Sequence, residues 1–409
     1  MSEPVLNLDM PPALPVEESH TQLSIEFTGS GSEYFRIWIV NLLLLLVTSG
    51  IYYPWAKVRR LRYFYGNTVV GGEPMGFHAN PVKLLKGYLL VGLLFILYSA
   101  AGQFSATAGF VAFLIVAVLW PALLKSAMQF RMANTSWRGL RFAFRGSLAD
   151  AYRAVLPLFI PSLVILGALT QVADPEKPPL WYVKTVGVVG LASLAVLPWL
   201  LWNLKQYQHN HYAFASLQTT FKATLGSFYK LFFKILGVTM LPLLLPIGVA
   251  GAAVYAMKTS GTLTRSSTGL IVMIAMLGFF AAMVTVMVLV KPYATSRFQN
   301  LVWTRTGNAS LRFVSQLRFG ALLWLTLKNW LLVMLTLGLY WPFAAVAMAR
   351  MRVQAVTVKT RVSPDTLLSQ ARAVEGDAAG EAGGDLFGLD IGFDAHAGKP
   401  GAYAFCQLL

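Results

Sequence analysis

Residues 41–60 read NLLLLLVTSGIYYPWAKVRR, and residues 329–348 read NWLLVMLTLGLYWPFAAVAM. Nine of the twenty positions are identical, and they include the Asn, Thr, Gly, Tyr and Pro that interrupt each apolar run. A matched pair of segments near both ends of one chain indicates an internal repeat. The fold therefore depends on how each of these two segments is arranged relative to a membrane.

The composition of the chain indicates an integral membrane protein. Its 409 residues are 56% hydrophobic and only 12% charged, whereas about a quarter of the residues in soluble domains are charged. Most of its apolar segments reach the roughly 20 residues that a helix needs to cross the hydrocarbon core. We expect an all-α polytopic membrane protein of helical hairpins with apolar segments 34–55, 84–103, 104–124, 154–172, 181–202, 231–257, 269–290 and 320–343.

The charges between these segments predict an orientation. Segments 57–86, 125–153, 203–234 and 291–318 together hold 21 basic residues and 2 acidic residues, whereas the connections between them are short and nearly balanced. By the positive-inside rule the basic segments are cytoplasmic, where they face anionic lipid headgroups. This loop bias accounts for the net charge of +16, so we expect no nucleic-acid partner.

The basic segments also carry strand-like runs. In the run 134–147, Leu140, Phe142 and Phe144 alternate with Arg141 and Arg145, which is the period of a half-buried strand. Similar runs occur at 23–35, 67–79, 210–227 and 300–316. We therefore expect short cytoplasmic β-hairpins between the helical hairpins. A proline is expected to close each preceding span: Pro54, Pro121, Pro198, Pro292 and Pro342.

Three regions follow from these patterns. Residues 1–33 form a cytoplasmic arm with a short strand, 34–360 form the transmembrane domain, and 361–409 form a flexible tail rich in Gly, Ala and Asp. The first 30 residues lack a basic region followed by an apolar one, so no cleavable signal is expected. The single cysteine, Cys406, excludes an intramolecular disulfide and a cysteine metal cage.

The opening pair of segments leaves two topologies open. If all eight segments crossed the membrane, both termini would lie outside, and the basic residues of 350–361 would lie on the wrong side. In the alternative, a helix runs to Thr48 or Thr336, turns at the glycine, and returns to the cytoplasmic side. We favour this re-entrant arrangement, although only about six residues, or roughly 9 Å of helix, separate Gly50 from Lys57.

The stretch FTGSGSEYFRIWIVNLLLLLVTSGIYYPWAKVRRLRYFYGNTVVGGEPMGF at 27–77 resembles the YjgN-like bacterial inner-membrane family, a domain of unknown function. The resemblance covers about residues 23–360, and Ser49 stands where leucine is usual. It implies a multi-pass inner-membrane protein but no activity, cofactor or catalytic residue. The matching positions are Phe27, Gly29, Gly31, Glu33, Tyr34, Phe35, Asn41, Thr48, Gly50, Ile51, Tyr52, Pro54 and Trp55, with a later strand at 134–142.

The residues that could take part in catalysis or metal binding do not form a pattern typical of an enzyme. No apolar segment contains Asp or Glu, which argues against a proton-coupled mechanism. His209 and His211 would face the same way in a strand, but no nearby Cys, Asp or Glu completes a metal shell. We therefore expect no enzymatic activity, cofactor or metal, and an interfacial role for the two histidines.

Two functions remain. Broken segments arranged as a repeat pair often line substrate sites, so the first, and the one we expect, is a small-solute transporter or channel. The second is a non-transporting membrane organiser or assembly partner that uses its cytoplasmic β-hairpins, as a homo-oligomer or with a membrane protein. Lys328 would line a polar pathway or extend its amine towards the interface. The candidate pathway or turn residues are Asn41, Thr48, Gly50, Tyr52, Pro54, Lys328, Asn329, Thr336, Gly338, Tyr340 and Pro342.

Overall fold

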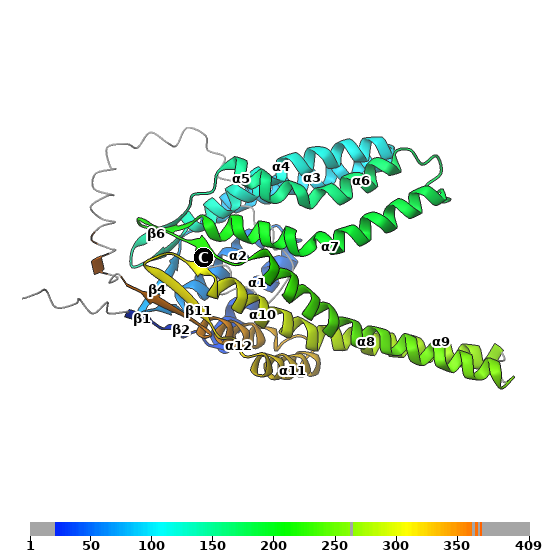
Figure 1. Cartoon of the computed structure of the whole chain (residues 1–409). Helices are drawn as coiled ribbons and strands as arrows, with labels where there is room; N and C mark the ends of the chain where they lie inside the picture. Colours follow the sequence, from blue (N-terminus) through cyan, green and yellow to red (C-terminus); the bar gives the residue numbers. More distant parts are fainter. Residues whose placement is uncertain (1–20, 262–264, 362–364, 367–368, 370–409) are drawn as a thin grey trace, which may run out of the picture.

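The computed structural model describes residues 21–261, 265–361, 365–366 and 369. Its helices extend to one side of a group of short strands (Figure 1). The helices are α1 Gly31–Val47, α2 Tyr53–Gly66, α3 Pro81–Phe104, α4 Ala106–Ala133, α5 Leu148–Val155, α6 Ile160–Leu169, α7 Leu180–Asn210, α8 Leu225–Thr259, α9 Arg265–Thr285, α10 Lys291–Thr304, α11 Phe319–Leu335 and α12 Trp341–Gln354, with a 3-10 turn η1 at Leu156–Phe159 and a π-helical turn η2 at Val286–Val290.

The strands form two antiparallel sheets. One has the order β1-β12-β11-β10-β9 and the other the order β2-β3-β4-β5-β6-β7-β8. The strands are β1 Thr21–Leu23, β2 Ile25–Phe27, β3 Thr68–Val70, β4 Glu73–Phe77, β5 Thr135–Trp137, β6 Leu140–Phe144, β7 Tyr212–Phe214, β8 Leu217–Gln218, β9 Thr220–Phe221, β10 Thr306–Gly307, β11 Leu311–Ser315 and β12 Val356–Thr360.

The two sheets are joined to each other through the chain at both of their edges. Only Ser24 separates β1 from β2, and only Thr219 separates β8 from β9, so each of these two chain segments passes from one sheet to the other. Each sheet is thus continued by the other at both edges. We call this closed series the strand ring. Continuation at both edges limits the free strand edge available for pairing with another chain.

Five helices lead directly into strands of the ring. These are α2, α4, α7, α10 and α12, followed by β3, β5, β7, β10 and β12. At three of the junctions a buried threonine begins the strand, and its hydroxyl donates to the carbonyl four residues earlier: Thr68 to Phe64, Thr135 to Arg131 and Thr306 to Val302, at 2.8, 2.9 and 2.8 Å. The hydroxyl thereby satisfies a carbonyl that the helix end leaves without an intrahelical partner.

The main hydrophobic core lies between the strand ring and these helix ends. It joins Phe64 of α2 and Met132 of α4 to strand residues such as Phe77, Phe142 and Val356. Each fully buried side chain of this kind contributes about 1.5–3 kcal/mol to folding. In β6 the residues Leu140, Phe142 and Phe144 are buried and Arg141 is exposed, which confirms the predicted alternation.

Away from the strand ring the apolar helices form two arms that diverge (Figure 1). One arm contains α3, α4, α6 and α7, and the other contains α8 and α9. Among the described residues, six helical stretches are long and apolar enough to cross a membrane: Pro81–Phe104, Ala106–Ala133, Leu148–Leu169, Leu180–Asn210, Leu225–Thr259 and Gly269–Thr304. The remaining apolar segments, 34–55 and 320–343, are each interrupted between two helices.

Several sequence expectations are corrected here. The fold is mostly helical, but "all-α" omits two extended sheets. Pro121 and Pro198 do not end their helices, because α4 and α7 continue to Ala133 and Asn210; residues packed on both sides sustain a helix across a single missing donor. Residues 300–304 belong to α10, and residues 31–35 begin α1 instead of extending a strand.

The strand β12 was not predicted, although its buried and exposed positions alternate as Val356, Val358 and Thr360 against Thr357 and Lys359. It pairs with both β1 and β11, so it joins the N-terminal strand to the rest of its sheet. Most of the predicted tail 361–409, with Cys406, and residues 1–20 of the predicted arm lie outside the described residues.

Candidate functional site: the paired helix–turn–helix segments

The first helix–turn–helix segment, α1 to α2, reverses direction through Thr48–Tyr52. Ser49 and Gly50 adopt φ values of 48° and 91°, in the left-handed region that glycine enters without strain. The Gly50 amide donates to the Leu45 carbonyl at 2.8 Å, which closes the end of α1. The Thr48 hydroxyl donates to the Leu44 carbonyl at 2.7 Å and accepts from the Tyr52 amide at 3.1 Å.

The second segment, α11 to α12, repeats this turn. Leu337 and Gly338 have φ values of 48° and 95°, and the Gly338 amide donates to the Val333 carbonyl at 2.8 Å. The Thr336 hydroxyl donates to the Leu332 carbonyl at 2.7 Å and accepts from the Tyr340 amide at 2.9 Å. In both segments the threonine hydroxyl is therefore engaged by the turn itself.

The prolines of the two segments occupy the same place as well. Pro54 and Pro342 are buried at the starts of α2 and α12. At the first turn of a helix a proline removes only a donor that has no intrahelical acceptor. These prolines lie at the starts of the return helices.

The two asparagines have different surroundings. Asn41 is 7% exposed, donates its side-chain amide to the Ala56 carbonyl at 3.5 Å, and accepts from Arg59 Nη1 at 3.5 Å. Asn329 is 5% exposed, and within the described residues its Nδ2 has no hydrogen-bond partner. A buried donor without an acceptor costs about 1–3 kcal/mol.

The cations of the first segment have no counterpart in the second. Lys57 is 5% exposed and donates to the Tyr88 hydroxyl of α3 at 2.8 Å, and Arg59 also donates to the Tyr52 hydroxyl at 3.3 Å. The equivalent positions, 288 residues later, are Ala345 and Ala347. A direct alignment of the two quoted stretches shows this difference.

The two segments contact each other through α1 and α12. The Phe35 and Phe343 rings lie with their centroids 5.9 Å apart, and the Phe343 ring occupies the space beside Gly31 where a side chain would otherwise lie. Arg350 of α12 donates to the Gly29 carbonyl at 2.8 Å. The start of the first segment and the return helix of the second thus form one packed unit.

The start of α1 is held by a polar cluster next to this contact. Ser30 caps the helix in a capping box with Glu33, and the Tyr63 hydroxyl of α2 donates to the Ser30 carbonyl at 2.7 Å. Burial, reinforced by the Glu33 carboxylate, raises the pKa of Tyr63 to about 12. The phenol therefore stays protonated and links α2 to the entry of α1.

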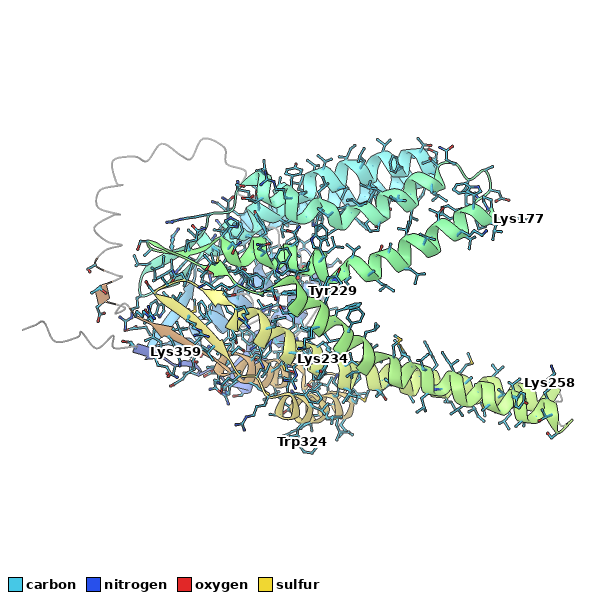
Figure 2. The ribbon with its side chains drawn as sticks, in the orientation of Figure 1. Lys177, Tyr229, Lys234, Lys258, Trp324 and Lys359 are labelled. Atoms are coloured by element: carbon cyan, nitrogen blue, oxygen red, sulfur yellow. The ribbon has the colours of Figure 1, made fainter. Side chains whose placement is uncertain are left out.

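Lys328 lies apart from the other candidate residues. It is exposed on the outer face of α11, whereas the buried face of that helix carries Leu322, Thr326 and Asn329. Trp324 also projects outward from α11 (Figure 2) and is 71% exposed. The structure therefore does not place the Lys328 side chain beside Asn329.

The two histidines lie at the end of α7, not in a strand. His209 is buried, with its ring Nδ1 3.0 Å from the Thr306 hydroxyl, and the His211 ring Nδ1 lies 2.7 Å from the Tyr207 carbonyl. Both rings serve the helix–strand junctions of α7 and α10. No group of three or more His, Cys, Asp or Glu side chains lies together in the described part of the chain.

Comparison with known proteins identifies the family to which this chain belongs. The sequence profile of the DUF898 family, described as bacterial protein of unknown function, matches residues 22–386. Inner membrane protein YjgN of Salmonella typhimurium strain LT2 is 25% identical over 343 residues, which cover 78% of this chain and 84% of that protein. Inner membrane protein YjgN of Escherichia coli O157:H7 is 27% identical over 190 residues, 44% of this chain and 47% of that protein.

No solved structure matches the chain. The named relatives and the six helical stretches that can cross a membrane agree on a multi-pass protein of the bacterial inner membrane. The resemblance stated from the motif at 27–55 is confirmed. The chain belongs to the DUF898 family of bacterial proteins and is similar to inner membrane protein YjgN.

Proposed function

We propose that this chain is a non-transporting membrane organiser, in which a cytoplasmic strand ring holds two apolar helical arms apart in the inner membrane. The main observation behind this proposal is that the helices of both arms are largely exposed on the surface of the structure. In the most apolar window of each of the six candidate spans, only 0% to 28% of the residues are buried inside the structure. A transporter that encloses a pathway packs its helices around it, whereas these helices present their surfaces to lipid or to another protein.

The turn geometry supports the same proposal. The hydroxyls of Thr48 and Thr336 each make two hydrogen bonds within their own turns. They are therefore poor candidates for lining a solute pathway. What the two segments supply instead is a pair of short apolar hairpins anchored on the strand ring.

The proposal includes an orientation. The basic segments 57–86, 125–153, 203–234 and 291–318 surround the strand ring, so the positive-inside rule makes the ring and both termini cytoplasmic. Lys177 and Lys258 lie at the far ends of the two arms, opposite Lys359 in the ring (Figure 2). The α1–α2 and α11–α12 segments are then re-entrant from the cytoplasmic side.

The orientation is tested by a reporter that is active only in the periplasm, fused after Arg361. We expect no signal, and we expect a strong signal from the same reporter inserted after Lys177. A strong signal after Arg361 contradicts the cytoplasmic C-terminus and, with it, the re-entrant arrangement of the second segment.

The proposal also includes an internal repeat. Each of α2, α4, α7, α10 and α12 ends in a strand of the ring. Asn67 and Asn134 each donate their side-chain amide to the carbonyl four residues earlier, at 2.8 and 2.7 Å, and buried threonines follow both. We infer that a unit of helix, junction and strand has been repeated along the chain, with the helical arms as insertions between units.

A photo-crosslinking experiment tests the organiser function. A crosslinking residue replaces Phe280 on α9, which is 68% exposed, and a control replaces Phe228, which is 3% exposed in the core. In the bacterial membrane we expect a defined protein adduct, either a second copy or another membrane protein, from position 280 only. Adducts with lipid alone at position 280 argue against an assembly role for this arm.

A small-solute transporter or channel is the second candidate, favoured by Asn329. Its buried amide has no partner among the described residues, and broken helices in matched pairs often line substrate sites. The full chain in liposomes is assayed for the flux of potassium, glycerol and urea. The organiser proposal expects flux no greater than that of empty liposomes, whereas flux that falls in the double variant Asn41→Leu, Asn329→Leu supports transport.

A further inference from the structure

The Arg59 guanidinium is held in place by neutral oxygens. Its Nη1 donates to the Tyr52 hydroxyl at 3.3 Å and to Asn41 Oδ1 at 3.5 Å, and the residue is exposed. A guanidinium has five N–H donors in a planar fork. In the described part of the chain, its Nε and Nη2 make no hydrogen bond, so one edge of this fork is open.

The Arg59 guanidinium has no carboxylate partner among the described residues. Residues 34–72 contain Arg36, Lys57, Arg59, Arg60 and Arg62 but no Asp or Glu. None of the ion pairs between described residues includes Arg59. A planar fork that carries charge and has no carboxylate is suited to a phosphate, which it binds through two parallel hydrogen bonds.

An exposed apolar surface continues from this site to the tip of the segment. Val40, Leu43, Val47 and Ile51 are 42%, 56%, 82% and 66% exposed, and the first three recur at the spacing of one helical face. Asn41 lies seven residues before Thr48, so the turn lies about 10 Å beyond the polar site along the helix. That distance is close to the depth at which an interfacial helix sits below the headgroups.

We propose that Arg59, positioned by Asn41 and Tyr52, binds the phosphate of an anionic phospholipid whose acyl chains lie along the exposed face of α1 and the turn. The Tyr52 hydroxyl accepts from Arg59 and turns its own hydrogen toward the phosphate. The site sets the depth of the α1–α2 segment, with the turn about 10 Å below the phosphate level. This inference rests on the proposed re-entrant placement of the α1–α2 segment, but it does not depend on whether the protein organises a partner or transports a solute.

The second segment is an internal comparison for this site. It keeps Asn329 and Tyr340 at the positions of Asn41 and Tyr52, but Ala347 replaces the arginine. The proposal therefore assigns lipid binding to the α1–α2 segment and not to α11–α12. The difference comes from the cations, of which Arg59 is the one bonded to Asn41 and Tyr52, and not from the shape of the turn, which is the same in both.

The test measures lipid binding to the purified full chain by native mass spectrometry, with dioctanoyl phosphatidylglycerol, dioctanoyl phosphatidylcholine and inorganic phosphate as probes. We expect the anionic lipid to bind the wild type more tightly than the zwitterionic lipid or phosphate. Arg59→Gln should weaken binding of the anionic lipid about tenfold, as expected for loss of charge-assisted hydrogen bonds. Arg312→Gln, at an exposed arginine of β11, makes the same charge change and should leave binding within about twofold.

A milder pair of variants guards against loss of folding. Tyr52→Phe removes one hydroxyl from the site and should weaken binding about threefold, whereas Tyr340→Phe removes the matching hydroxyl from the second segment and should have no effect. Equal weakening by Arg59→Gln and Arg312→Gln overturns the proposal, because it indicates general attraction to charge. Binding of inorganic phosphate as tight as that of the anionic lipid also overturns it, because the site then recognises a free anion.

Discussion

The two helix–turn–helix segments share a turn but differ in the chemistry beside it. Ser49 and Leu337 have the same φ of 48°, and Gly50 and Gly338 differ by only a few degrees. Yet Asn41 is paired with Arg59, whereas the amide of Asn329 has no partner among the described residues. The same backbone turn therefore forms beside different partners, because Ala347 stands where the first segment has Arg59.

The shared residues explain why the turn survives this divergence. The threonine hydroxyl bonds to the turn at both its donor and acceptor sides, and glycine enters the left-handed region at no steric cost. Proline then begins the return helix with a φ that suits a helix start. Position 49 or 337 tolerates Ser and Leu alike because its side chain points away from the protein, as the 95% exposure of Leu337 shows.

The largest expected effect tests the shared turn. Gly50→Val and Gly338→Val each place a β-branched residue at φ above 90°, where the backbone is strained even though no atom lies within 4 Å of the new Cβ. We expect a loss of about 1–3 kcal/mol of unfolding free energy in each case, measured by denaturant titration in micelles. Gly66→Ala, at an unstrained helix position, is the control and should not destabilise the protein.

A clear difference between the two valine variants contradicts the equivalence of the turns. Gly338→Val could lower the unfolding free energy only slightly while Gly50→Val lowers it strongly. In that case the second turn rearranges without loss of stability, and equal φ values do not mean equal contributions to stability.

A second pair of variants tests the difference in the asparagines. Asn41→Leu removes the acceptor of Arg59 and the donor to Ala56, and we expect a loss of about 1–2 kcal/mol. Asn329→Leu removes an amide whose Nδ2 has no acceptor among the described residues, so it should be neutral or stabilising. The same titration in micelles measures both, and equal destabilisation contradicts the contrast between the two sites.

A third pair tests the hydroxyls. Thr48→Val and Thr336→Val each remove one hydroxyl that donates to a carbonyl and accepts from an amide. We expect both variants to lose about 1 kcal/mol of unfolding free energy without a change in the basal solute permeability of liposomes. A change in permeability from either variant would instead place that threonine on a solute pathway.

The smallest effect concerns pH. The Tyr63 phenol has a pKa of about 12 in the folded protein, above its ordinary 10.0. Folding therefore favours the protonated phenol, and this stabilisation is fully present below pH 10 and is lost as the pH rises towards 12. The ultraviolet difference titration of wild type minus Tyr63→Phe should show a midpoint near 12.

Most of the helices could be predicted from the sequence because they depend on local patterns of apolar residues. Apolar length marked α3, α4, α7, α8 and α9, and the alternation of Leu140, Phe142 and Phe144 marked β6. The ends of some helices could not be predicted in this way. Pro198 reads as a helix end, but α7 continues for 12 residues beyond it to Asn210, because long helical stretches on both sides outweigh one missing hydrogen bond.

The candidate site divides in the same way. The Thr-Gly-Tyr-Pro pattern marked the turn residues, and the repeat at 329–348 pointed to two such turns. The pattern did not show that Lys328 faces outward while Asn329 is buried. Adjacent residues on a helix lie about 100° apart, and only packing against neighbouring helices decides which of them is covered.

By itself, the sequence determined that this is a membrane protein of the DUF898 family, with apolar helices, basic segments between them and two interrupted segments in matched positions. Those properties follow from composition, charge and short-range backbone preference. Only the tertiary structure decided that β1 and β2, near the start of the described chain, and β12, near its end, belong to one strand ring and that α1 packs on α12. Partners separated by more than 300 residues leave no local pattern, since their pairing depends on the assembled core.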